Sequence, residues 1–190
     1  VVLNENSSLK YKEVFNKRVV SLEGEAFFDV TKDKEHPFTV NVNRTTTQVL
    51  GTSFNMDAHQ NGKVELALLT GKVKFSNTKN NSIILLPGEK AVYDEHTASF
   101  SMRKQNNENS ISWKTNKLVF DNTNLLEVVK DLNDYYKTEI TLTSSDVNCS
   151  FTGTFENAAI SEVLDVISFS LNAEVKLSNN VYSITSIECN

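Results

Sequence analysis

The sequence predicts an all-β region followed by an α+β region with a βαββαβ order of elements. Three observations lead to this fold class: short strand-like runs fill the first half, a polar stretch follows them, and an internal repeat with helical periodicity occupies the rest. We therefore expect an all-β domain at residues 1–104, a linker at 105–110 and an α+β domain at 111–190.

Composition favours a globular chain and excludes some partners. The 190 residues are 39% hydrophobic, which is enough to build a core, and 19 basic against 24 acidic residues give a net charge of −5. The charges form no long basic run, so nucleic acid is not expected as a partner. No apolar run reaches the about 18 residues that a membrane-spanning helix needs.

The first half alternates short apolar runs with turn signals such as Glu23-Gly24, His36-Pro37 and Pro87-Gly88. Alternation is plain at Phe38–Val42, where apolar and polar residues take turns, and no stretch keeps a helical period for three turns. Strands in this pattern form a sandwich, a barrel or a solenoid, and we expect a sandwich- or solenoid-like arrangement. The expected strands are 18–22, 26–30, 38–42, 46–50, 64–69, 71–75, 83–86, 90–93 and 98–102.

The second half contains two copies of one pattern, in which Phe120–Leu132 aligns without a gap on Phe155–Ile167 at an offset of 35 residues. Each copy predicts a strand, a turn, a helix and a second strand, and Val181–Ile184 adds a final hairpin strand. Asn122 or Asn124 in the first copy and Asn157 in the second are the candidate helix caps.

Each predicted helix carries one apolar face, and we interpret both faces as core rather than as a cofactor pocket. The faces consist of Leu125, Val128, Val129, Leu132 and Tyr136 in the first helix, and of Ile160, Val163, Leu164, Ile167 and Leu171 in the second.

No catalytic or metal-binding motif stands out, so we expect no enzymatic activity, no cofactor and no metal. The histidines His36, His59 and His96 are scattered in polar stretches, where solvated side chains are expected. Cys149 and Cys189 form no metal-ligand spacing, and whether they pair is left open.

Several blocks resemble the FecR domain. The specific ones are Gly24–Val30 (GEAFFDV) and Val49–Asn55 (VLGTSFN), with Pro37-Phe38-x-Val40 and Leu86–Glu89 in support. After the linker, the stretch from Trp113 to Val129 resembles the C-terminal domain of FecR-type regulators in Bacteroidetes. That domain is similar to the secretin and TonB-receptor N-terminal (STN) fold, which is also βαββαβ.

The resemblance implies a non-enzymatic periplasmic sensor. In this family the signalling domain of a TonB-dependent receptor docks on the sensor, and the signal passes through an inner-membrane helix to a cytoplasmic segment that controls an extracytoplasmic-function sigma factor. The resemblance places both the helix and the sigma-binding segment upstream of Val1. The alternative is a carbohydrate- or envelope-binding β-module without a signalling role.

Two segments are candidate sites. Some FecR-type regulators are cut by an uncatalysed shift at a Gly-Thr bond that corresponds to Gly51-Thr52, although this dipeptide is also an ordinary turn at a strand end. The strand Phe151–Phe155, with Thr152, Gly153 and Thr154 between the two phenylalanines, is the candidate partner-binding edge. Its alternative role is a central strand whose phenylalanines are core.

Overall fold

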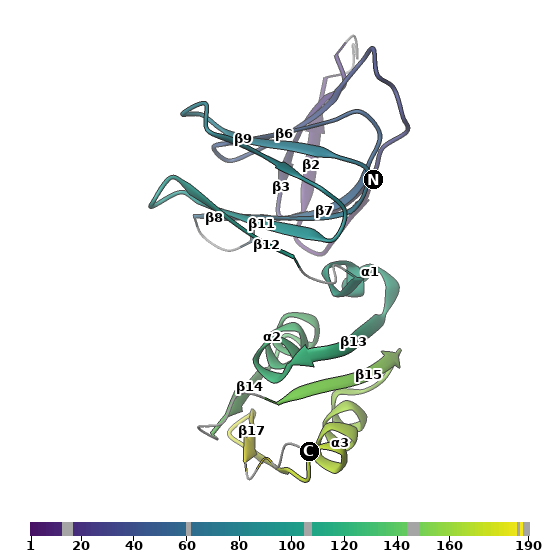
Figure 1. The fold of residues 1–190 in the computed structure, drawn as a ribbon, viewed down its shortest axis with the longest axis vertical. Helices are drawn as coiled ribbons and strands as arrows, with labels where there is room; N and C mark the ends of the chain where they lie inside the picture. The colour runs from purple at the N-terminus through teal and green to yellow at the C-terminus, as the bar shows by residue number, and fades with distance from the viewer. Residues whose placement is uncertain (13–16, 60–61, 105–107, 144–148, 186, 188–190) are drawn as a thin grey trace. The chain divides into compact units, whose positions relative to one another are not determined.

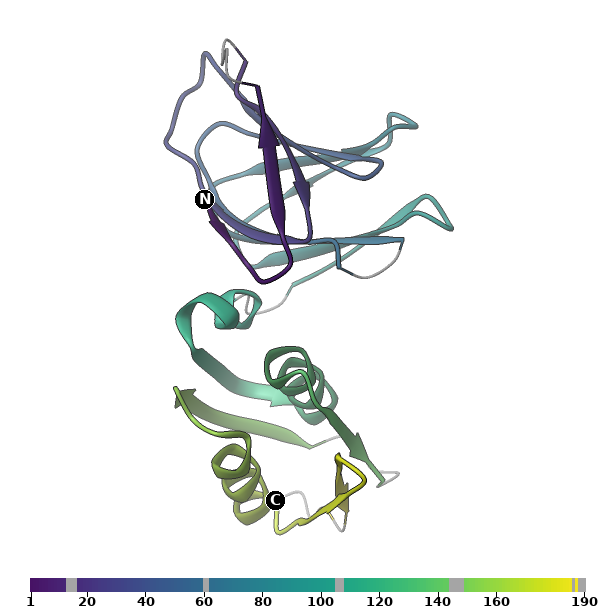
Figure 2. The ribbon, with the colours of Figure 1, turned by 180° about the vertical axis from the view of Figure 1, so that it is seen from behind.

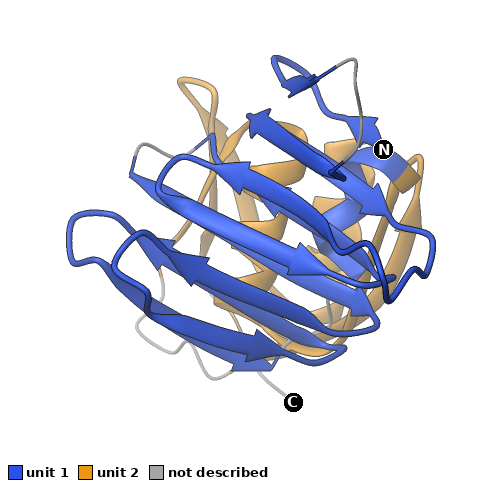
Figure 3. Cartoon of the chain, turned by 90° about the horizontal axis from the view of Figure 1, so that it is seen from above, with its two compact units in different colours: residues 1–114 blue, residues 115–190 orange. Residues whose placement is uncertain are grey.

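The computed structural model describes residues 1–12, 17–59, 62–104, 108–143, 149–185 and 187. The chain divides into a first unit, Val1–Lys114, and a second unit, Thr115–Asn190, which Figure 3 colours separately. Among the described residues, no helix has both the length and the apolar character that crossing a membrane requires.

The described part of the first unit contains two six-stranded sheets (Figures 1 and 2). In sheet order, one contains β1 (Val2–Leu3), β4 (Glu25–Asp29), β7 (Ser53–Asp57), β8 (Lys63–Thr70), β11 (Glu89–Asp94) and β12 (Ser99–Lys104). The other contains β10 (Ser82–Leu85), β9 (Val73–Asn77), β6 (Thr45–Val49), β5 (Phe38–Val42), β3 (Val19–Glu23) and β2 (Ser8–Tyr11). Neighbouring strands are antiparallel except β3 and β5, which are parallel.

Alternating side chains join the two sheets into a sandwich. On β5 the apolar residues of the alternating pattern are buried, as the sequence predicts. Phe28 on β4 stacks on Phe54 of β7 with ring centroids 5.0 Å apart, and it lies 6.1 Å from Phe38 of the other sheet. These contacts place the core between the sheets and select the sandwich over the solenoid.

Strand β7, which lies in the interior of its sheet, is not among the strands expected from the sequence. Its Phe54 and Met56 are fully buried in the core, while Asn55 between them faces the other side of the sheet and is still only 4% exposed. Lys114 of the short helix α1 (Ser112–Thr115) lies over the ring of Phe27, the cross-strand partner of Asn55. The outer face is therefore partly covered, which explains why Asn55 is buried, while Ser53–Asp57 keeps the polar–apolar alternation typical of a strand.

The second unit contains, in chain order, β13 (Lys117–Asn124), α2 (Leu125–Tyr136), β14 (Glu139–Leu142), β15 (Ser150–Glu156), α3 (Ile160–Ser170), β16 (Glu174–Ser178) and β17 (Val181–Thr185). In its described part the strands form two small sheets: β13 pairs with β15, and β17 lies between β14 and β16. The hairpin strand β17 runs parallel to β14, so the last strand rather than β13 completes that sheet.

Both helices bury their predicted faces. Leu132 on α2 and Ile167 on α3 are fully buried. Asn124 caps α2, since its Oδ1 accepts a hydrogen bond from the Leu126 amide at 2.9 Å. The predicted cap Asn157 is wrong because it takes a positive φ of 50° in the turn after β15, and α3 instead begins after Ala159, whose amide donates to Glu162.

The boundary between the units differs from the predicted linker at 105–110. Residues 105–107 lie outside the described residues, and Glu108–Ile111 forms a 3₁₀ helix, η1, which leads into α1. Ser112 is 5% exposed, and the first unit extends to Lys114. The first unit thus extends past residue 110, where the predicted linker ends. The independent folding of a domain at 111–190 stays a prediction.

Candidate functional site

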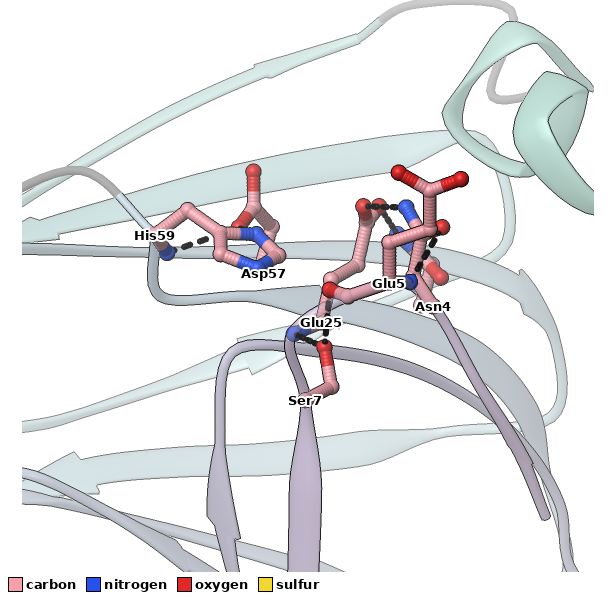
Figure 4. Close-up of polar contacts among 7 residues, drawn as sticks. Asn4, Glu5, Ser7, Glu25, Asp57 and His59 are labelled. Carbon is pink, nitrogen blue, oxygen red and sulfur yellow. Dashed lines mark hydrogen bonds and ion pairs between the residues drawn. The ribbon is translucent and has the colours of Figure 1, made fainter.

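Glu25, Asp57 and His59, which we call the carboxylate–histidine cluster, lie on the outer side of β4 and β7 (Figure 4). Each residue offers one ligand atom, and these atoms all lie within 4.8 Å of one another. Glu25 and Asp57 are direct cross-strand partners, which places their carboxylates on the same face of the sheet. Among the described residues, this cluster is the group of histidine, aspartate and glutamate side chains that could hold a metal ion.

Glu25 is only 9% exposed, and both its side chain and its backbone form hydrogen bonds. Its Oε2 accepts a hydrogen bond from Asn4 Nδ2 at 2.6 Å, and its Oε1 accepts one from Asn55 Nδ2 at 2.7 Å. Its backbone amide donates to Ser7 Oγ at 2.8 Å. Burial raises the pKa of the Glu25 carboxyl, the two amide donors partly oppose that rise, and the nearby Asp57 carboxylate adds to it.

Asp57 and His59 form the more exposed side of the cluster. Their side chains are 30% and 39% exposed, and His59 Nδ1 lies 2.9 Å from Asp57 Oδ1. The His59 amide donates to the same oxygen at 2.8 Å. From the sequence, His59 is expected to be a solvated residue. The Asp57-x-His59 spacing was visible, but its juxtaposition with Glu25 depends on strand β7, which had not been predicted.

Gly51 and Thr52 lie just before β7, opposite the end of β4. Gly51 has a φ of +145°, and a Cβ there would lie 2.5 Å from the Cα of Lys32, so glycine is required on both grounds. The Thr52 amide donates to the Val30 carbonyl at 3.2 Å, and the Thr52 carbonyl accepts from the Val30 amide at 2.9 Å. Thr52 is 3% exposed, and its Oγ1 has no hydrogen-bond partner in the described part of the chain. A buried, unengaged hydroxyl therefore follows the Gly51 carbonyl.

The predicted binding segment Phe151–Phe155 lies within β15. Phe151 and Phe155 stack with centroids 6.1 Å apart, and both pack on the core of the second unit. Thr152 and Thr154 are exposed. Within the described residues β15 pairs with β13 alone, so the strand lies at an edge of its sheet. Its phenylalanines nevertheless belong to the core.

Cys149 is buried at the start of β15 and is disulfide-bonded. Its carbonyl accepts a hydrogen bond from the Leu125 amide at 2.9 Å, which ties this end of β15 to the start of α2. Cys189, the other cysteine of the chain, lies outside the described residues.

Comparison with known proteins gives matches in both units. The family described as "FecR protein" matches residues 1–74, and the family described as "FecR, C-terminal" matches residues 117–184. A search of curated proteins gave no match. Two crystal structures of a protein assigned as an anti-sigma factor from Parabacteroides distasonis ATCC 8503 are similar, with 27% and 26% identity and TM-scores of 0.67 and 0.65. Each alignment covers 96% of this chain and 87% of the other.

Proposed function

Because this chain is a FecR-type anti-sigma regulator, we propose that it forms the periplasmic sensor region of such a regulator, without enzymatic activity. In this proposal it binds the signalling domain of a TonB-dependent outer-membrane receptor and relays the signal to an extracytoplasmic-function sigma factor. The observation that carries the proposal is the pair of FecR matches, one in each unit, together with an anti-sigma factor structure aligned over 96% of the chain.

The disulfide-bonded Cys149 supports a periplasmic location, since disulfides persist in oxidising compartments. The proposal includes anchoring in the inner membrane, because FecR-type regulators are anchored there by a helix. The order of strands and helices from β13 to β16 supports an STN-like assignment for the second unit.

We place the receptor contact on the edge of β15. An edge strand has backbone N–H and C=O groups without ladder partners, and it can accept a strand from another chain. The Thr152 and Thr154 side chains carry no charge and are exposed, so they offer no electrostatic barrier to such pairing. The proposed contact is thus main-chain pairing between this edge and an edge of the receptor domain.

Calorimetric titration of the full chain tests the proposal. We expect saturable one-to-one binding of a purified receptor signalling domain and no heat of binding with envelope glycans. Binding of glycans without binding of the signalling domain would instead support the carbohydrate-binding β-module.

We further propose that the Gly51-Thr52 bond is cut without an added enzyme. Thr52 Oγ1 attacks the Gly51 carbonyl carbon, the peptide C–N bond breaks as an ester forms, and water then hydrolyses that ester. The buried, unengaged Thr52 hydroxyl supports this step because no hydrogen bond holds it away from the carbonyl.

Intact mass after prolonged incubation is expected to show two fragments, one ending at Gly51 and one beginning at Thr52. Thr52→Ser should retain the cut, because serine keeps the hydroxyl, and Thr52→Ala should abolish it. An intact wild-type chain at the end of the incubation would leave Gly51-Thr52 as a structural turn.

A further inference from the structure

We propose that the carboxylate–histidine cluster, together with Asn55, binds one divalent transition-metal ion of the Zn²⁺ type. The set offers one imidazole nitrogen, two carboxylates and one amide oxygen. Imidazole with carboxylate ligands suits Zn²⁺ and its first-row neighbours, whereas Ca²⁺ and Mg²⁺ prefer sites made of oxygen alone.

The spacing of the cluster is close to what a metal requires. In a tetrahedral site with bonds of about 2.1 Å, ligand atoms lie about 3.4 Å apart. The candidate ligand atoms of Glu25, Asp57 and His59 lie within 4.8 Å of one another, so rotation of the half-exposed His59 and Asp57 side chains is enough to close the site. Asp57 is the last residue of β7, His59 lies two residues further along the chain, and Glu25 is the cross-strand partner of Asp57 on β4.

Asn55 supplies an independent observation. Its side chain is only 4% exposed, and its amide lies against Glu25, since Nδ2 donates to Glu25 Oε1 at 2.7 Å. Its Oδ1 is buried and has no hydrogen-bond partner among the described residues. A buried carbonyl oxygen without a partner destabilises the fold. A cation held beside Glu25 would satisfy this oxygen.

The negative charge of the cluster and the hydrogen bond that orients Glu25 also favour a bound cation. Glu25 and Asp57 bring two carboxylates together on one face. Among the described residues, the ion pair that involves either of them is the contact of Asp57 with His59. The amide of Asn4 orients Glu25 from its second oxygen, as an outer-shell partner orients a metal-ligating carboxylate. The ion would thus join β4 and β7, with the N-terminal segment held on Glu25.

The chain contains a matched control in Asp33 and His36. His36 Nδ1 lies 3.1 Å from Asp33 Oδ2, much as His59 lies beside Asp57. The Asp33–His36 pair has no third ligand residue nearby in the described part of the chain that would make it a candidate metal site. Asp33 also pairs with Arg18 Nη1 at 3.8 Å, so His36→Ala tests whether the loss of an exposed histidine by itself changes Zn²⁺ binding.

The test is calorimetric titration of the full, untagged chain with ZnCl₂ after EDTA treatment, followed by thermal unfolding with and without Zn²⁺. We expect one ion per chain and a raised unfolding temperature for wild type and for His36→Ala. His59→Ala should weaken binding at least about tenfold and remove the thermal shift, and Asp57→Asn should do the same.

Both substituted residues are partly exposed, so the variants are expected to fold, which far-UV circular dichroism checks. Equal Zn²⁺ affinity in His59→Ala and wild type, or an equal loss in His36→Ala and His59→Ala, would overturn the proposal. The absence of binding to wild type would do so as well. None of these outcomes depends on receptor binding, so this experiment tests the metal proposal independently of the proposed function.

Discussion

Leu132→Ala and Ile167→Ala are each expected to lower the free energy of unfolding of the second unit by about 2–5 kcal/mol. Both side chains are fully buried, and they occupy equivalent positions of the internal repeat, one on α2 and one on α3. Truncation removes apolar contacts and leaves a cavity that the surrounding helices and strands fill only in part.

Leu126→Ala and Val166→Ala are the matched controls, because these side chains lie on the same two helices but are 53% and 45% exposed. We expect changes within about 0.5 kcal/mol for both controls. Denaturant unfolding can separate the units, since the single tryptophan, Trp113, belongs to the first unit and the long helices belong to the second. Equal effects for buried and exposed positions would show that the helical faces are misassigned.

Replacing Thr152 and Thr154 together with lysine is expected to weaken binding of the receptor signalling domain at least about tenfold. Both side chains are exposed on β15, and lysine on an edge strand opposes pairing with another chain. Thr152 Oγ1 also accepts a hydrogen bond from the Asn122 amide at 2.9 Å, so far-UV circular dichroism is used to check that the variant is folded. A tenfold loss corresponds to about 1.4 kcal/mol of binding free energy.

Lysine at Ser99 and Ser101 provides the control for added charge. These residues are exposed on β12, which lies at the edge of a sheet in the first unit. We expect unchanged affinity for this variant, measured by the same titration. Equal weakening by both lysine pairs would indicate a general effect of charge, and full affinity of the β15 variant would place the receptor contact elsewhere.

Local patterns in the sequence were sufficient for several elements. Strict alternation predicted β5, and the apolar residues spaced three and four apart predicted the buried faces of α2 and α3. Asn124 as the cap of α2 also follows from local chemistry, because its side chain reaches an amide two residues away. These features depend on near neighbours along the chain, which the sequence displays directly.

Tertiary structure decided what depends on distant residues. The alternation of Ser53–Asp57 is a local signal for β7, but the burial of Asn55 on the outer face depends on pairing with β4 and on the cover of α1. The same pairing brings Glu25 to Asp57 and His59, and the first unit, in which Ser112 is buried, extends past the predicted linker to Lys114. By itself the sequence determined the class of each half, since periodicity is local. The sandwich, the two small sheets of the second unit and the carboxylate–histidine cluster arise from strand pairing across long separations, which a local period does not encode.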